Sequence, residues 1–96
     1  MQTISPTELK AVINNSDIQI IDVREPYEFE DNNIGGINIP LDEVLNSVDK
    51  IDTNKKVIFC CQSGKRSSAI IMTLERKFKL ENLHSLQGGV TAFIES

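Results

Sequence analysis

The sequence has few metal-binding or disulfide-forming residues, with two cysteines and one histidine among 96 residues. The cysteines, Cys60 and Cys61, are adjacent, and neighbouring residues do not form the disulfide that staples a small domain. Two thiols and His84, at no recognisable spacing, are too few for a structural zinc site. We therefore expect no disulfide framework and no structural metal. At this length we expect a single compact domain over residues 1–96.

Long apolar runs and a basic leader are also absent. No stretch approaches the roughly 20 apolar residues that span a bilayer. Residues 1–6 lack the basic start and apolar run of a signal peptide. We therefore expect a soluble, cytoplasmic protein without a membrane partner. The net charge of −4 argues against general affinity for nucleic acid.

The charge is unevenly placed along the chain. Residues 1–49 hold ten acids and two bases, whereas residues 50–96 hold four acids and eight bases. An anion-binding site is therefore expected in the second half. A solvated surface would give the same distribution, so charge alone does not decide between the two.

Short apolar segments alternate with segments of helical spacing. Strands are predicted at residues 18–23, 37–39, 56–60 and 83–86. Helices are predicted at residues 6–13, 25–31, 41–48, 67–78 and 90–94. Strands that alternate with helices predict an α/β fold with a parallel sheet covered on both faces. Functional sites in such folds lie beyond the carboxyl ends of the strands, which is where Cys61 falls.

Cys61 precedes a glycine-containing loop that opens a helix. The amides and dipole at a helix start favour negative charge, and Lys65 and Arg66 add full positive charges. These effects favour the thiolate, which is the nucleophilic form, and Gly64 allows a tight turn. The alternative is that both cysteines are small buried residues. The loop favours the reactive interpretation for Cys61, whereas Cys60 should point to the opposite face and pack.

Three segments in register resemble the rhodanese family. Cys61-Gln62-Ser63-Gly64-Lys65-Arg66-Ser67 is similar to its active-site loop. Residues 21–29 and 35–40 resemble its first signature and the continuation of that signature. Gly88-Gly89-Val90 with Phe93 resembles its closing glycine pair and aromatic residue. The chain departs from the family where residues 31–36 lack a common histidine, and where Phe93 replaces the usual tryptophan.

The resemblance implies a three-layer rhodanese-like α/β fold, with a five-stranded parallel sheet and helices on both faces. It also implies a sulfurtransferase that needs no cofactor. Cys61 would take sulfane sulfur from a donor such as thiosulfate, or from a protein persulfide, and pass it to a thiol or to cyanide. A sulfur-carrier protein is a further candidate partner. The persulfide would be stabilised by the amides of the loop, formed by Gln62, Ser63, Gly64, Lys65 and Arg66.

Asp22, Arg24 and Glu28 could suggest an acid–base site. An aspartate at a strand end followed by arginine and glutamate more often forms an ion pair and caps a turn. We expect Asp22 and Arg24 to support the loop rather than to react.

Two alternatives remain open. Cys60 is followed by five residues and then by Arg66, and this spacing of cysteine and arginine is the phosphate-binding signature of protein tyrosine phosphatases. Some phosphatases and arsenate reductases share the rhodanese fold, and Asp22 or Asp31 are loose candidates for the general acid. The second alternative is a non-catalytic regulatory module, although inactive rhodanese-like domains usually lack the loop cysteine. The spacing of Gly64 and Arg66 from Cys61 favours the sulfurtransferase.

Overall fold

A five-stranded sheet forms the middle layer of the protein. The computed structural model describes residues 1–96, and all neighbouring strands are parallel, in the order β1-β5-β4-β2-β3. The strands are β1 (Gln2–Ile4), β2 (Ile18–Asp22), β3 (Ile37–Asn38), β4 (Lys56–Cys60) and β5 (Leu83–Leu86). The prediction of a five-stranded parallel sheet is confirmed.

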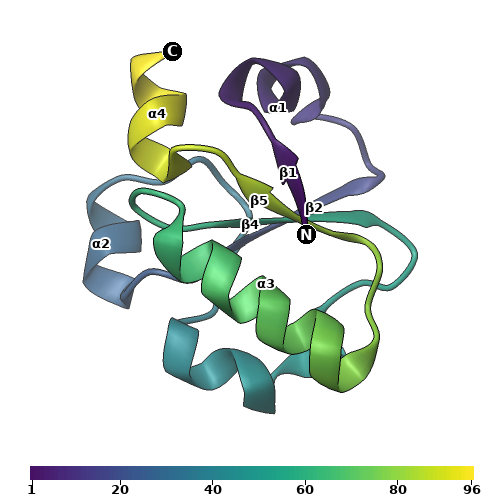
Figure 1. Ribbon diagram of the computed structural model, residues 1–96. Coiled ribbons are helices and arrows are strands. Elements are labelled where there is room, and N and C mark those ends of the chain that lie inside the picture. Colours follow the sequence, from purple (N-terminus) through teal and green to yellow (C-terminus); the bar gives the residue numbers. More distant parts are fainter.

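Helices cover both faces of this sheet, as the resemblance implied. They are α1 (Pro6–Val12), α2 (Pro26–Asp31), α3 (Lys65–Phe78) and α4 (Gly89–Glu95), with two 3₁₀ segments, η1 (Leu41–Asn46) and η2 (Val48–Lys50). Figure 1 shows α1 and α4 on one side of the sheet and α3 with the 3₁₀ segments on the other. None of these helices has the length and apolar character needed to cross a membrane.

Two apolar clusters join the three layers. The larger packs α3 and η1 against the sheet, with Phe59 of β4 and Leu74 of α3 fully buried. The smaller packs α1 and α4 against the opposite face and includes Leu9 of α1 and Val90 of α4. Because side chains alternate along a strand, consecutive residues of β4 supply both clusters.

Several predicted elements differ from the structure. Strand β1 has no counterpart among the strands predicted from residue patterns, since only Ile4 of its three residues is buried. The helix predicted at residues 41–48 is instead two 3₁₀ segments separated at Ser47, because η1 buries only Val44 and has no continuous apolar face. Helix α3 begins at Lys65, slightly before its predicted start at about residue 67. Phe78, expected on the apolar face of α3, is 42% exposed.

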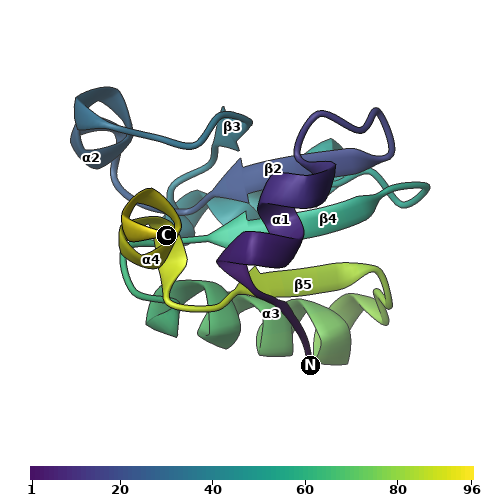
Figure 2. The ribbon, with the colours of Figure 1, turned by 90° about the horizontal axis from the view of Figure 1, so that it is seen from above.

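The strands end together at one edge of the sheet. Figure 2 shows the arrowheads of β2, β4 and β5 pointing toward the side where α2, α4 and the start of α3 lie. This edge brings residues from distant parts of the sequence to the segment that follows β4.

Candidate active site

Cys61 lies directly after β4, at the carboxyl edge of the sheet. Its side chain is 1% exposed and belongs to the cluster on the α3 face. Cys60, the last residue of β4, is fully buried in the cluster under α1 and α4. Alternation along the strand therefore places the two thiols on opposite faces of the sheet, as the sequence predicted.

Two backbone amides donate hydrogen bonds to the sulfur of Cys61. The amide of Gly64 lies 3.0 Å from Sγ, and the amide of Ser67, in the first turn of α3, lies 3.4 Å from it. Gly64 has φ of 102°, a left-handed conformation that favours glycine and lets the loop turn back over the sulfur. The amides of Ser63, Lys65 and Arg66 donate to no protein acceptor and are free for a bound group. Ser67 was not among the predicted site residues.

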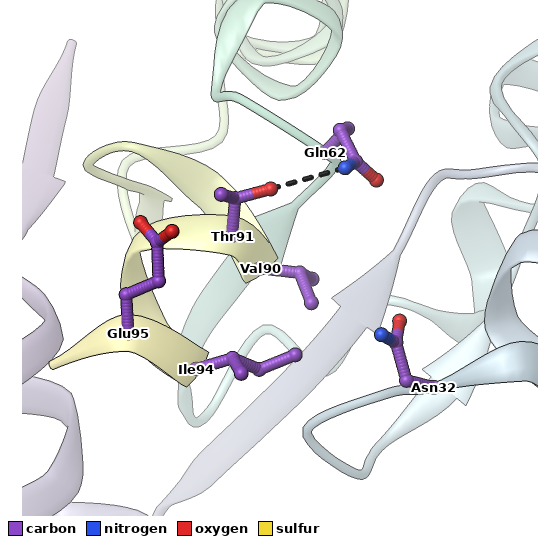
Figure 3. A pocket seen from close by; sticks show the side chains of 6 residues that line it. All are labelled: Asn32, Gln62, Val90, Thr91, Ile94 and Glu95. Carbon is purple, nitrogen blue, oxygen red and sulfur yellow. Dashed lines mark hydrogen bonds between the residues drawn. The ribbon is translucent and has the colours of Figure 1, made fainter.

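The start of α4 fixes the loop from the other side. The amides of Val90 and Thr91 donate to the carbonyls of Cys61 (2.8 Å) and Gln62 (3.2 Å). The Gln62 side chain donates to Thr91 Oγ1 at 3.0 Å, as Figure 3 shows. A Cβ atom on Gly89 would collide with the same two carbonyls. The closing glycine pair thus allows the backbone of α4 to contact the loop.

Arg66 forms an ion pair across the site. Its guanidinium donates to both carboxylate oxygens of Glu28, in α2, at 3.0 and 3.1 Å. This hydrogen-bonded pairing raises the pKa of Arg66 and lowers that of Glu28. Lys65 is exposed and forms no ion pair. The loop therefore has one free cation, Lys65, and one whose charge Glu28 balances. Sequence reasoning missed this role of Glu28, because the two residues lie 38 positions apart.

Asp22 and Arg24 form a buried ion pair at 2.8 Å, with both residues at most 1% exposed. Asp22 Oδ1 also accepts from the Arg24 amide at 3.0 Å, which is the turn-capping contact expected from the sequence. Arg24 donates in addition to the carbonyl of Asn32 at 2.6 Å. The hydrogen bonds that Arg24 donates to the Asp22 carboxylate raise the pKa of Arg24. The pair supports the segment beside the loop and makes no contact with Cys61 Sγ.

Hollows flank the loop on both sides. Two of them, about 180 and 300 Å³ in volume, share Asn32 and Gln62; α4 lines the first and α2 lines the second. Figure 3 shows the first, with Val90 and Ile94 facing Asn32. A third, shallow hollow of about 360 Å³ is lined by Lys65 and several hydroxyl groups. Cys61 lines none of them, so the loop itself covers the thiol.

Known proteins resemble this chain along almost its whole length. The Rhodanese-like domain model matches residues 5–96. YqhL of Bacillus subtilis is 39% identical over 90 residues, which cover 93% of this chain and 69% of YqhL. Mouse thiosulfate sulfurtransferase/rhodanese-like domain-containing protein 3 is 40% identical over 81 residues, covering 69% of this chain and 52% of the mouse protein. This chain therefore spans about half the length of the mouse relative.

Solved structures give the same result. The crystal structure of a rhodanese-related protein from Thermoplasma volcanium superimposes with a TM-score of 0.87 and 28% identity. The superposition covers 99% of this chain and 92% of that one. Together with the loop around Cys61 and the parallel sheet that carries it, these similarities show that the chain belongs to the rhodanese-like domain family.

Proposed function

We propose that the protein is a sulfurtransferase that carries sulfur as a persulfide on Cys61. The observation that carries the proposal is the position of Sγ, which accepts hydrogen bonds from the amides of Gly64 and Ser67 at the start of a helix. Such donors stabilise the thiolate that must attack the donor molecule. The name of the mouse relative, which includes thiosulfate sulfurtransferase, supports the same activity.

The reaction has two half-reactions, as expected for covalent catalysis. The Cys61 thiolate attacks the outer sulfur of thiosulfate, whose S–S bond breaks, and the electron pair leaves with sulfite. The new S–S bond leaves a persulfide anion on Cys61. An acceptor thiolate or cyanide then attacks the terminal sulfur, and the electron pair of the broken S–S bond returns to Sγ as thiolate.

The free amides of the loop are the donors available to the transferred sulfur. Those of Ser63, Lys65 and Arg66 have no protein acceptor and stabilise the persulfide anion in the manner of an oxyanion hole. Gln62 contributes by anchoring the loop to Thr91 of α4.

The donor is either thiosulfate or a persulfide on another protein, and the acceptor is a thiol. Lys65, as the exposed and unpaired cation, attracts an anionic donor. Arg66 contributes less attraction than a free arginine because Glu28 balances its charge. A sulfur-carrier protein remains a candidate partner.

The alternative based on Cys60 has less support. That thiol lies on the opposite face of the sheet, within the cluster of Leu9 and Val90. Burial, followed by the nearby charge of Asp22, raises its pKa well above the usual value. A phosphatase counted from Cys60 would need its thiolate in the loop, where Cys61 lies instead. A non-catalytic module would leave the free amides of the loop without a ligand.

Formation of thiocyanate from thiosulfate and cyanide tests the proposal. We expect activity in the wild type and in Cys60→Ala, a change that keeps an apolar side chain in an apolar cluster. We expect none in Cys61→Ser. Activity that survives in Cys61→Ser, or that depends on Cys60, would contradict the proposal. A wild-type protein inactive with thiosulfate is next assayed with a protein persulfide donor, and inactivity with both donors favours the binding module.

A further inference from the structure

Three serine hydroxyls form a hydrogen-bonded chain that starts at the sulfur of Cys61. Sγ lies 3.7 Å from Ser67 Oγ, which lies 2.8 Å from Ser85 Oγ. Ser85 Oγ in turn lies 3.2 Å from Ser68 Oγ. Ser67 and Ser68 belong to the first turn of α3, whereas Ser85 comes from β5. Nothing in the loop motif specifies Ser85.

This chain connects a buried thiol with solvent. Cys61, Ser67 and Ser85 are each at most 2% exposed. Ser68 is half-buried, and together with Ser85 it lines the shallow hollow on the Lys65 side of the loop. A proton that leaves the thiol therefore has a path of hydroxyl groups to water.

The hydrogen bonds of the chain can run in either direction. When Cys61 is a thiol, its Sγ–H donates to Ser67 Oγ, and Ser67 donates to the Gly64 carbonyl at 3.1 Å. That carbonyl also accepts from the Ser68 amide at 3.1 Å, so Ser67 can turn away without leaving it unpaired. The contacts of Ser85 with Ser67 and Ser68 allow either oxygen of each pair to be the donor.

We propose that Ser85 is a positioning residue that, through Ser67, stabilises the thiolate of Cys61, and that the serine chain reverses its direction when the thiol ionises. The Ser67 hydroxyl first turns from the Gly64 carbonyl to Ser85. The Sγ–H bond then breaks with its electron pair left on sulfur, and protons pass from Sγ to Ser67, from Ser67 to Ser85, from Ser85 to Ser68, and from Ser68 to water. After these transfers each hydroxyl donates toward the sulfur. The inference deepens the proposed function and shares with it the assignment of Cys61 as the nucleophile.

No charged side chain donates a hydrogen bond to Sγ in place of the serines. Arg66 is paired with Glu28, Arg24 is paired with Asp22, and Lys65 is exposed. Other titratable groups on the elements around Cys61 lie away from the sulfur. Cys60 and His84 are on the opposite face of the sheet, and Asp42 and Glu43 are on the exposed side of η1. The others stand at the far ends of their elements: Lys56 at the start of β4, Glu75, Arg76 and Lys77 near the end of α3, and Glu95 at the end of α4. The amides of Gly64 and Ser67 and the Ser67 hydroxyl are thus the hydrogen-bonding groups in direct contact with the sulfur, and Ser85 acts through Ser67.

The pH dependence of alkylation tests this role without requiring sulfur transfer. Iodoacetamide reacts with thiolate, and fragment masses assign the product to Cys61 or Cys60. In Ser67→Ala, which removes the direct donor, the alkylation midpoint of Cys61 should rise by about one pH unit. In Ser85→Ala it should rise by about half a unit, or roughly threefold less thiolate below the midpoint. Ser85→Thr, which keeps the hydroxyl, should restore most of the wild-type profile.

Two further variants make the outcome decisive. Thr73→Val removes a hydroxyl from α3 that bonds only to the Ala69 carbonyl, and it should leave the midpoint unchanged. Ser68→Ala changes the less buried end of the serine chain, so it should raise the alkylation midpoint of Cys61 less than Ser85→Ala does. It also provides a second test if Ser85→Ala does not fold. Folded Ser85→Ala or Ser68→Ala with the wild-type midpoint would overturn the inference, as would a wild-type Cys61 that no pH makes reactive. If the alkylation midpoints shift as expected but the protein never forms a persulfide, the proposed function would be overturned instead.

Discussion

At the scale of single residues, two chemically identical side chains have different surroundings. Cys61 Sγ accepts hydrogen bonds from two amides, whereas Cys60 lies among apolar side chains on the other face of the sheet. Burial raises the pKa of Cys60 and keeps it a neutral thiol. Because only a thiolate is strongly nucleophilic, the alternation of side chains along β4 supports Cys61 over Cys60 as the nucleophile of the proposed reaction.

Glu28, whose carboxylate balances the charge of Arg66, gives a prediction of pH-dependent stability. Glu28→Gln should lower the free energy of unfolding at pH 7 by about 0.5–1 kcal/mol, the value of a partly exposed ion pair. The Glu25 amide donates a hydrogen bond to Glu28 Oε2, and a glutamine at position 28 can still accept that bond. The substitution therefore removes the ion pair and keeps the hydrogen bond at the start of the helix. The hydrogen bonds from Arg66 hold the pKa of Glu28 below its usual value. This stabilisation is therefore complete above the unfolded pKa of about 4.3 and is lost as pH falls through the lower folded value.

Urea unfolding at pH 7 and near pH 3 measures the effect. The difference between the wild type and Glu28→Gln should shrink at the acid pH. Glu30→Gln, an exposed position in the same helix with no ion pair, should match the wild type at both pH values. A Glu28→Gln deficit that stays constant with pH would show that the ion pair is not its cause.

At the scale of elements, the short helix α4 holds the loop after β4 through its backbone. Val90 and Thr91 donate to the carbonyls of Cys61 and Gln62, and Gly89 permits that approach. Position rather than length gives this helix its importance, since it spans only seven residues.

Replacing Gly89 with alanine should displace α4 from the loop. The added Cβ collides with two carbonyls, and φ of 65° adds backbone strain, so Gly89→Ala should lower the free energy of unfolding by about 2–4 kcal/mol and reduce thiocyanate formation. Gly35→Ala is the matched control. Gly35 also has a positive φ, 101°, but its Cβ would meet nothing within 4 Å, so only about 1–2 kcal/mol of strain is expected. Equal losses in urea unfolding would contradict a steric role for Gly89.

The sequence predicted the elements whose apolar side chains follow the spacing of a strand or a helix. β2, β4, β5 and α3 are of this kind, and their order was enough to indicate a parallel sheet. β1 was missed because its pairing with β5 depends on backbone hydrogen bonds that carry no side-chain pattern. The segment at residues 41–48 has helical spacing, but its Leu45 is 40% exposed, and the chain forms 3₁₀ turns instead.

The candidate site was predicted where it is local in sequence. Cys61, Gly64 and the presence of a helix after the loop follow from one motif. The partners of the loop do not, because Glu28 and Ser85 approach it only when α2 and β5 take their places in the fold. The sequence does not indicate which residue a serine in a short strand, or a glutamate in a short helix, will contact in the folded protein.

At the scale of the whole molecule, a buried ion pair ties the carboxyl edge of the sheet together. Asp22 ends β2 and Arg24 lies just beyond it, and Arg24 donates to the carbonyl of Asn32 after α2. The side-chain amide of Asn38, in β3, donates to the carbonyls of both Asp22 and Arg24. Three elements therefore depend on one network, and all three lie on the α2 side of the loop.

Removing one partner of this pair should destabilise the whole domain. Asp22→Ala leaves the buried Arg24 charge uncompensated, and such a change costs about 3–5 kcal/mol. That is a large part of the roughly 5–15 kcal/mol by which domains are stable. The double variant Asp22→Ala/Arg24→Met should recover part of the loss, since no unpaired charge remains. Urea unfolding of the three proteins checks this, and a double variant less stable than Asp22→Ala would contradict it.

The central claim is that Cys61 alone carries the transferred sulfur, and intact mass tests it most directly. Reduced wild type, Cys60→Ala and Cys61→Ser are incubated with thiosulfate, and separately with a protein persulfide, and then weighed by mass spectrometry. We expect the wild type and Cys60→Ala to gain the mass of one sulfur atom, removable by reductant, and Cys61→Ser to gain none. Sulfur on Cys61→Ser, or no gain in the wild type from either donor, would contradict the claim.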